Sequence, residues 1–322
     1  MIIKPYHFDR NLEVISLLNR VFKPWMGDEN YFIWKYKKID DFSFPLAWII
    51  EKDDKIIAFN GYRPRKIITY GKEFWSVQSF DTVTDPDYQG QGLFKLLQSS
   101  LYEKMRLSNI VWVYGWTSEI GYRAFTKKAD WEIWGRQRYL MKVIKIKKLQ
   151  FLPYLILSKF SRLSFPSISS KIKVKEKRIF PQSFNNICKN FETIALRDIS
   201  YLNWRISNPD MLYKLFMAYI NEEPKGYIII SEKDNCLNIH DLLSESPSVL
   251  FSLLSTIEHI AIKNKNDLIL FRVNENHPYS KTFYRAGYFW SNTSFKMLGR
   301  KLFHNLPIST NNLHWTYFDR NE

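Results

Sequence analysis

The stretch at residues 77–107 limits the folds open to this chain more than any other part of the sequence. An apolar run over 77–84 leads into a short segment with two glycines, Gly90 and Gly92, and a helix-periodic stretch follows. A strand that enters a helix through a glycine-spaced loop exposes backbone N–H groups at the positive end of the helix dipole. The stretch therefore predicts a loop that binds phosphate groups.

Two familiar phosphate-binding patterns do not fit this loop. A P-loop ends in Gly-Lys followed by Ser or Thr, whereas Leu93 and Phe94 follow Gly92 here. A dinucleotide fingerprint needs Gly or Ala three residues after its second glycine, where Lys95 stands. We therefore expect another phosphate-containing ligand.

Length and composition allow two domains, each with its own core. The chain has 322 residues, 45% of them hydrophobic and 17% aromatic, and a domain usually has about 100 to 200 residues. No run of about 18 apolar residues occurs, and no apolar run follows a basic N-terminus, so we expect a cytoplasmic protein. Cys188 and Cys236 have no partner at metal-binding spacing, so we expect neither a zinc site nor a disulfide framework.

The net charge of +15 is concentrated in one segment. Residues 142–178 hold eleven Lys and Arg residues against the single acid Glu176, which gives this segment +10 of the total. A solvated basic linker is the favoured interpretation, and contact of residues 147–177 with a membrane surface is an alternative. Nucleic acid is a less favoured partner because the flanking regions are close to neutral. Pro153 opens a basic helical pattern with a Phe- and Leu-rich stripe, which fits a packed linker helix or an interfacial helix on anionic lipid.

The first 145 residues predict a sheet with helices. Periodicity and turn residues place strands at 1–6, 46–51, 55–62, 66–70, 74–84, 110–114 and 132–143. Helices are expected to begin near residues 9, 30, 93 and 118. The strand at 110–114 is apolar throughout, as expected of a strand covered on both faces.

The glycine loop resembles the pyrophosphate-binding motif of the GCN5-related N-acetyltransferase (GNAT) superfamily, Gln/Arg-x-x-Gly-x-Gly/Ala. Gln89 and Gly92 match it, whereas Phe94 stands where the motif has Gly or Ala. The resemblance implies a GNAT fold over residues 1–145, with acetyl-CoA as co-substrate and no metal. It also implies that the pyrophosphate is held by Gln89, Gly90, Gln91, Gly92, Leu93 and Phe94, and the pantetheine arm by the backbone of Thr82, Val83 and Thr84.

Direct attack of an amine on a thioester needs a base for the amine and an acid for the departing thiolate. Asp81, a carboxylate in an otherwise apolar strand beside the loop, is the expected base, with a structural role as the alternative; Glu119 is a second candidate. In many superfamily members the acid is a tyrosine whose place falls to Thr126 here. Tyr122, one turn earlier on the same helix face, is the expected substitute, with packing in the core as the alternative. The six histidines show no paired spacing, and no chemistry is predicted for them.

Residues 180–322 repeat the first pattern in weaker form. Tyr31 and Trp34 recur as Tyr201 and Trp204, and two strands follow in each case. At the place of the second loop, residues 244–251 contain no glycine but include Glu245, which would repel a pyrophosphate. We therefore expect an α+β (α/β/α) protein with two tandem GNAT-like domains, each a mixed, mostly antiparallel central sheet flanked by helices. The predicted boundaries are 1–145 for the cofactor-binding domain, 146–179 for a basic linker with an amphipathic helix, and 180–322 for the degenerate copy.

The favoured function is an acyl-CoA-dependent N-acyltransferase that acts on a small-molecule amine. The ending at residues 315–319 resembles tandem acetyltransferases associated with surface polysaccharides, which suggests an amino sugar as acceptor. One alternative is transfer of an aminoacyl group from charged tRNA to a cell-wall precursor, as tandem relatives of this fold do. The other is a non-catalytic CoA-binding or scaffold protein. The expected location is the cytoplasm, with peripheral contact to the inner face of the membrane as an option.

Overall fold

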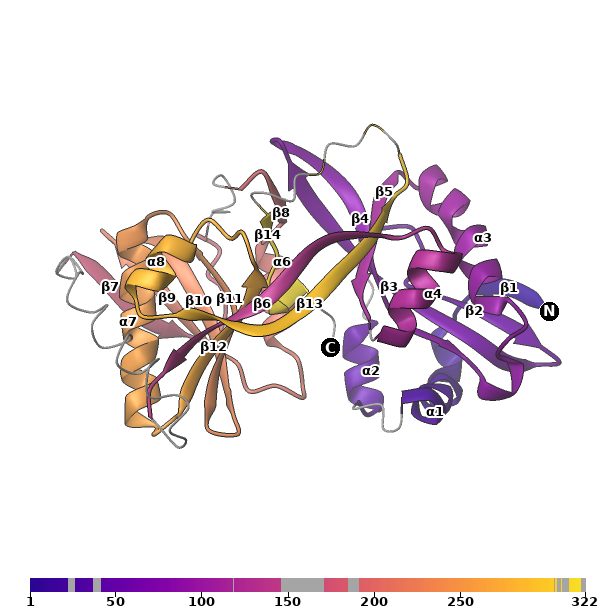
Figure 1. Cartoon of the computed structure of the whole chain (residues 1–322), viewed down its shortest axis with the longest axis horizontal. Coiled ribbons are helices and arrows are strands. Elements are labelled where there is room, and N and C mark those ends of the chain that lie inside the picture. Colours follow the sequence, from indigo (N-terminus) through magenta and orange to yellow (C-terminus); the bar gives the residue numbers. More distant parts are fainter. Residues whose placement is uncertain are drawn as a thin grey trace. The chain divides into compact units, whose positions relative to one another are not determined.

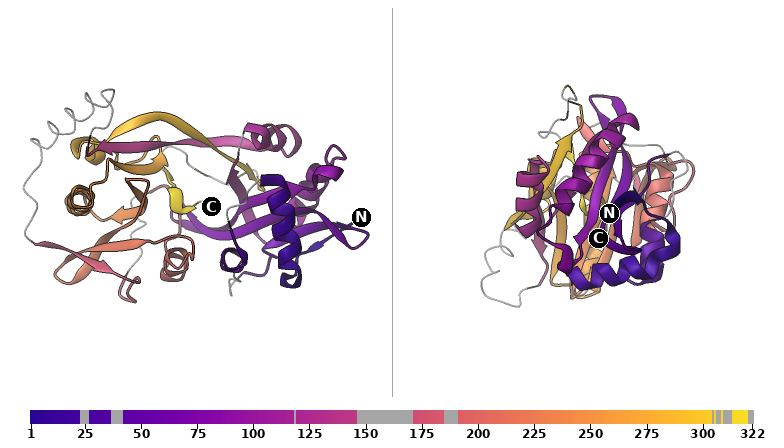
Figure 2. Two further views of the ribbon diagram at one scale, coloured as in Figure 1. Left: turned by 90° about the horizontal axis from the view of Figure 1, so that it is seen from below. Right: turned by 90° about the vertical axis from the view of Figure 1, so that its right-hand side faces the viewer.

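The computed structural model describes residues 1–22, 27–36, 42–117, 119–145, 171–184, 191–303, 305, 308 and 313–319. The chain forms two compact units, whose course can be followed by colour in Figure 1 and, from two further sides, in Figure 2. The first unit contains Met1–Gly135 and Lys296–Ile308, and the second contains Arg136–Phe295 and Ser309–Asp319. Neither unit is therefore one continuous piece of the sequence.

The sheet of the first unit has the strand order β1-β2-β3-β4-β5-β13. Its strands are β1 (Ile2–Pro5), β2 (Ala47–Lys52), β3 (Lys55–Thr69), β4 (Lys72–Thr84), β5 (Ile110–Trp116) and the end of β13 (Phe289–Lys301). All neighbours are antiparallel except β4 and β5, which are parallel. A parallel pair needs a crossover connection, and the helix α3 (Leu93–Leu107) provides it.

Helices cover both faces of this sheet (Figure 1). Leu97 and Leu101 of α3 lie in one core with Ala58 of β3, whereas Phe59 contacts Phe32 of α2. Successive strand residues point to opposite faces, so α3 and α2 cover opposite faces. The other helices of the unit are α1 (Asn11–Phe22), beside α2 (Glu29–Lys35), and α4 (Glu119–Lys128).

The sheet of the second unit follows the same plan, with the order β6-β12-β11-β10-β9-β7. Its strands are β6 (Glu132–Val143), β7 (Ile172–Lys177), β9 (Lys214–Ile220), β10 (Glu223–Lys233), β11 (Cys236–Ser244) and β12 (Leu268–Asn274). Again one pair is parallel, β11 with β12, and the helix α7 (Pro247–Lys263) connects the two strands. Shorter elements complete the unit: β8 (Thr193–Ala195), α6 (Ile199–Ile206), α8 (Ser280–Arg285), β14 (Leu313–His314) and the 3₁₀ turn η6 (Tyr317–Asp319).

Each unit is completed by a strand from the other half of the sequence. Residues 137–143 of β6 pair with β12 in the second unit, although β6 follows directly after the helices of the first. Residues 297–301 of β13 pair with β5 in the first unit, although β13 follows the helices of the second. The strand beside the parallel pair is therefore exchanged in both units.

The fold class predicted from the sequence is confirmed, since mixed and mostly antiparallel sheets are flanked by helices. The strands expected at 55–62 and 66–70 were wrongly separated, because β3 runs without a break through Pro64. β2 pairs with β3 only as far as Gly61, so the missing N–H of Pro64 interrupts no bond to β2.

The basic linker expected at 146–179 ends in a strand. Ile172 and Val174 of β7 alternate with lysines and pack against the core of the second unit, which gives the segment an apolar and a charged face. The helix expected to begin at Pro153 lies outside the described residues.

The sequence echo between residues 31–36 and 201–206 is also an echo in local structure. Asp28 caps α2 by accepting the N–H of Tyr31 at 2.8 Å, and Asp198 caps α6 by accepting the N–H of Tyr201 at 2.7 Å. In both helices a buried tryptophan is followed by a buried cation, Lys35 or Arg205.

Candidate functional site

The N-terminus of α3 is open to an anion. Gly90 and Gly92 have φ angles of 80° and 76°, a region that residues with side chains rarely enter. A Cβ atom on either glycine would meet no atom within 4 Å. Gly92 is the N-cap of α3 and offers no capping side chain, and the first turn contains no acidic residue. The N–H groups of Leu93, Phe94 and Lys95 therefore have no helix carbonyl as acceptor and can bind a phosphate.

A buried carboxylate fixes the lead-in to this loop. Asp85 is fully buried and caps the 3₁₀ turn η2 (Pro86–Tyr88) by accepting the N–H of Asp87 at 3.1 Å. It also pairs with Lys55 of β3 at 2.8 Å and with Arg20 of α1 at 2.9 Å. Burial alone would raise the pKa of this carboxyl, but the two cations and the amide hold it below its usual value. This role of Asp85 was not predicted from the sequence.

Gln89 closes the loop back onto the strand before it. Its side-chain amide donates to the carbonyl of Thr84 at 3.1 Å. Leu93, at the other end, is buried in the core below α3. Residues 90–92 between them are exposed, so the loop is held at both ends and free in the middle.

The end of β4 offers a free backbone edge next to the loop. β5 pairs with β4 only from Trp75 to Gln78. Residues 79, 80, 83 and 84 pair with β3 on their other side, and no β5 residue pairs with residues 79–84 in the described part of the chain. Val83 is buried, and the Thr82 hydroxyl donates to Asn60 Oδ1. An extended ligand could therefore pair with the backbone of Thr82, Val83 and Thr84, and not with the side chains of Thr82 and Val83.

Asp81 lies in this segment, but its carboxylate is engaged. Lys35 Nζ approaches it to 3.0 Å and the Tyr36 hydroxyl donates to it at 3.1 Å. The Asp81 side chain is 9% exposed and that of Lys35 is 3% exposed. Burial, together with the Asp81 charge, raises the pKa of Tyr36 well above its usual value, so this phenol stays a donor. An ion-paired carboxylate with little exposure can act as base or as a structural group, and its role stays a prediction.

The backbone around Asp81 is adapted to this contact. The register of β3 and β4 shifts between Phe59 and Gly61, which marks a bulge, and Asp81 has a φ angle of 47°. A Cβ atom on Gly61 would overlap the Tyr36 hydroxyl. Gly61 thus allows Tyr36 to reach the carboxylate.

The helix α4 brings the other predicted residues near the loop. Phe94 packs edge-on against Phe125 at 5.0 Å between ring centroids, so its side chain joins the first turn of α3 to α4. Tyr122 lies one turn before Phe125, is partly buried, and has the ammonium of Lys296 4.1 Å from its ring centroid. Thr126 is occupied as a donor to the Tyr122 carbonyl at 2.8 Å. The side chain of Glu119 lies outside the described residues.

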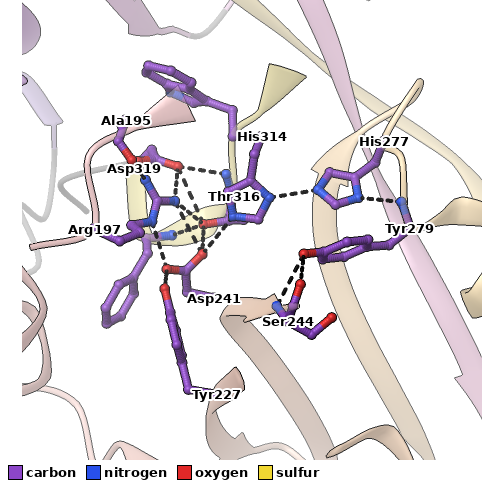
Figure 3. A network of polar contacts seen from close by, with 12 residues as sticks. Ala195, Arg197, Tyr227, Asp241, Ser244, His277, Tyr279, His314, Thr316 and Asp319 are labelled. Carbon is purple, nitrogen blue, oxygen red and sulfur yellow. Dashed lines mark hydrogen bonds and ion pairs between the residues drawn. The ribbon is translucent and has the colours of Figure 1, made fainter. Parts of the chain in front are cut away.

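A second polar cluster, in the interior of the second unit, was missed by the sequence analysis (Figure 3). Arg197 contacts Asp241 at 2.9 Å and Asp319 at 2.6 Å, and all three side chains are fully buried. Tyr227 donates to Asp241 at 2.7 Å, and Thr316 does so at 2.8 Å. Burial would lower the pKa of Arg197 and raise that of Asp241, but their mutual attraction overrides both effects and keeps the pair charged. The cluster clamps the segment at 313–319 to β11.

Two histidines continue this cluster as a directed chain of hydrogen bonds. The N–H of Tyr279 donates to Nδ1 of His277 at 3.2 Å, so the proton of His277 is on Nε2. That nitrogen lies 2.7 Å from Nδ1 of His314, whose own Nε2 faces Asp241 at 3.4 Å. Burial lowers the pKa of both histidines, which agrees with two neutral rings. The two residues are 37 positions apart, and no periodic pattern relates them.

The described residues contain no group of three or more His, Cys, Asp or Glu side chains that could hold a metal ion. Among the same residues, no helix is long and apolar enough to cross a membrane.

Comparisons with known proteins agree with this geometry. Residues 3–134 match a family model described as an acetyltransferase (GNAT) domain. Among solved structures, a GCN5-related N-acetyltransferase from Anabaena variabilis is similar, with 10% identity, a TM-score of 0.66 and coverage of 94% of this chain and 72% of that one. A probable N-acyltransferase from Enterococcus faecalis has the same identity and coverage, with a TM-score of 0.69.

A third similar structure is N-myristoyltransferase from Saccharomyces cerevisiae with bound myristoyl-CoA. It has 11% identity, a TM-score of 0.54 and coverage of 92% of this chain and 82% of that one. At such identities the likeness of solved structures shows the fold alone. No curated protein matches the sequence.

Proposed function

Residues 3–134 match a GNAT acetyltransferase domain, and on this premise we propose that the chain is an acyl-CoA-dependent N-acyltransferase with acetyl-CoA as donor. One observation carries the proposal. The open N-terminus of α3 lies directly after the segment of β4 that has no β5 partner. An anion site followed by a free strand edge suits a ligand with a pyrophosphate and an amide-containing arm.

The residues present fit such a ligand. The N–H groups at Gly90 to Lys95 would receive the pyrophosphate, where positive φ angles and free space allow a close approach of the backbone. The backbone of Thr82, Val83 and Thr84 would pair with the amides of the pantetheine arm. Phe94 does not block the loop, because its ring packs against Phe125. Bound acetyl-CoA would supply an acyl group that is activated as a thioester.

The acceptor amine would attack the thioester carbonyl, so that an N–C bond forms and the C–S bond breaks. We propose Asp81 as the group that takes the proton from the amine, with Glu119 as the second candidate. Tyr122 would give its proton to the departing sulfur. Lys35 and Tyr36 would orient the Asp81 carboxylate, since both contact it.

We assign the second unit a supporting role, as the degenerate half of a tandem pair. Along the sequence we propose the boundaries 1–145, 146–179 and 180–322, with the strands β6 and β13 exchanged between the two halves. The N-terminus of α7 is closed, because Ser246 caps the helix and Pro247 provides no N–H. Asp241, near the end of β11, is fully buried and paired with Arg197. Neither feature suits a cofactor or a proton transfer.

The acceptor we propose is a primary amine of a small molecule, with an amino sugar of surface polysaccharide synthesis as the specific candidate. We also propose a cytoplasmic protein, in which residues 147–177 form a solvated basic linker or, as the alternative, contact the membrane surface. Co-sedimentation of the full chain with vesicles of anionic lipid tests the contact, and absence of binding at low salt removes it.

Ligand binding and turnover test the proposal together. Acetyl-CoA at about 100 times its Kd should stabilise the protein by about 2.7 kcal/mol, and thioester cleavage should depend on an added amine. Gly92→Glu should abolish the stabilisation, since it places a carboxylate and a side chain at the open loop. Gly71→Glu is the matched control, because Gly71 has the same φ angle of 76° in an open turn at the other end of β4 from the loop. Absence of stabilisation in the wild type, or its survival in Gly92→Glu, contradicts the proposal.

A further inference from the structure

Lys296 is a cation that β13 brings to the first unit from the far end of the sequence. Its ammonium lies 4.1 Å from the centroid of the Tyr122 ring, the shortest distance at which a lysine faces an aromatic ring among the described residues. The backbone fixes this position, because the next residue, Met297, pairs with Trp116 at the end of β5. Trp116 lies three positions before α4, the helix that carries Tyr122.

This contact lies level with the free edge of β4, on the far side of β5. The ladder between β4 and β5 ends at Gln78 and Tyr114, and Trp116 is two residues beyond that point. Lys296 therefore lies level with the part of the sheet where β4 has lost its β5 partner. From the other side, the contact of Phe94 with Phe125 joins the first turn of α3 to α4, one turn from Tyr122. Two independent contacts thus bring the Lys296–Tyr122 pair to the proposed acyl-CoA site.

Together, Lys296 and Tyr122 could transfer a proton to a thiolate more readily than Tyr122 alone. When a phenol gives its proton to a leaving thiolate, negative charge develops on the phenol oxygen. An ammonium over the ring attracts that charge more strongly than it attracts the neutral phenol, so it favours the state after proton transfer. It also restricts the ring to one position, which proton transfer requires.

We propose that Lys296 is a positioning residue of the acyl-transfer site, where its ammonium holds the Tyr122 ring and stabilises the charge that develops as Tyr122 protonates the thiolate. The inference rests on the proposed function. In the step concerned, the C–S bond breaks, the phenol proton moves to the sulfur, and the phenolate regains a proton from solvent. The first unit then depends on the exchanged strand β13 for its chemistry as well as for its sheet.

Three full-length variants separate this role from simple packing. Lys296→Met removes the charge and keeps an unbranched side chain of similar length, and Lys296→Arg keeps the charge. Lys301→Met is the matched control, because Lys301 lies on the same strand with its ammonium 5.0 Å from the ring of Trp134. We expect Lys296→Met to lower kcat about tenfold or more at an unchanged KM for acetyl-CoA, and Lys296→Arg to restore most of it. Lys301→Met should stay within about twofold of the wild type.

A double variant shows whether Lys296 acts through Tyr122. If it does, adding Lys296→Met to Tyr122→Phe causes no further loss of kcat. An independent tenfold loss in that background, or wild-type kcat in Lys296→Met, overturns the inference. Lys296→Gln replaces the Met variant if that one does not fold. If the wild type binds and uses acetyl-CoA, a failure of these variants to behave as expected contradicts only the role of Lys296. If the wild type does not bind acetyl-CoA, both the proposed function and the role of Lys296 are contradicted.

Discussion

The two crossover helices, α3 and α7, begin in opposite ways. Both connect the strands of a parallel pair in sheets with the same plan. α3 begins at Gly92, without a capping side chain, whereas α7 begins with the Ser246 hydroxyl on the N–H of Val249 at 3.3 Å and with Pro247 in its first turn. The Ser246 cap and Pro247 leave α7 fewer first-turn N–H groups for a ligand than α3 has. The same local plan thus yields one helix end without a capping side chain and one that is capped.

The strands that lead to these helices show the same difference. Asp81 on β4 has one cation, Lys35, and keeps 9% of its side chain exposed. Asp241 on β11 is fully buried and contacts Arg197, Tyr227 and Thr316. In the first unit a carboxylate remains within reach of solvent, and in the second it has become part of the core.

The largest effect is expected from breaking the cluster in the second unit. Arg197→Met leaves Asp241 and Asp319 as buried carboxylates without their cation, which should cost about 3–5 kcal/mol. Unfolding in urea, followed by hydrogen exchange in each unit, measures the loss and its location. A loss below about 1 kcal/mol would mean that the cluster is not a clamp.

Asp81→Asn should act mainly on turnover. Loss of the base should lower kcat by about 100-fold or more while the affinity for acetyl-CoA is kept. Lys35→Met breaks the same ion pair and keeps the carboxylate, so it should lose clearly less kcat than Asp81→Asn, through the lost orientation of Asp81 alone. A loss of kcat in Lys35→Met as large as that in Asp81→Asn would contradict a role of Asp81 in proton transfer.

Mild acid should weaken the second unit selectively. Burial lowers the pKa of His240 to about 3 and those of His277 and His314 below their usual value. Below about pH 6.5 these histidines bind protons in the unfolded chain but not in the folded unit. Their contribution to the free energy of unfolding is therefore complete above about pH 6.5 and decreases as the pH falls below it. Each ring that stays neutral should cost about 1.4 kcal/mol between pH 7.5 and 5.5.

Hydrogen exchange at the two pH values checks this expectation unit by unit. His7, which is exposed, is the histidine that the structure describes in the first unit. An equal loss of protection in both units would show that the three buried histidines of the second unit do not cause the loss of stability in mild acid.

The sequence predicted what depends on local chain geometry. The glycine loop was recognisable because two glycines stand directly before a helix-periodic stretch. In the structure both glycines, Gly90 and Gly92, have the positive φ angles that glycine favours. The repeated helix start was recognisable because Tyr31 and Trp34 recur with the same spacing as Tyr201 and Trp204. Such patterns connect residues a few positions apart, so one sequence is enough to find them.

Contacts between distant segments could not be predicted in this way. Periodicity predicted β6 as a strand but does not reveal the partner of a strand, and β13 was not predicted, so the exchange of the two strands was hidden. Lys296 is 174 positions from Tyr122, and the partner of Lys35 is 46 positions away. His277 and His314 meet only because the segment at 313–319 is clamped to β11. Their roles depend on the assembled units.

Hydrogen exchange with and without acetyl-CoA tests the central claim most directly, namely that the open helix end of the first unit holds the cofactor. The account predicts slower exchange of the backbone N–H groups at residues 82–84 and 89–95 on binding, with no change at residues 244–251. Protection at 244–251, or bound acetyl-CoA with unchanged exchange at 89–95, would contradict it.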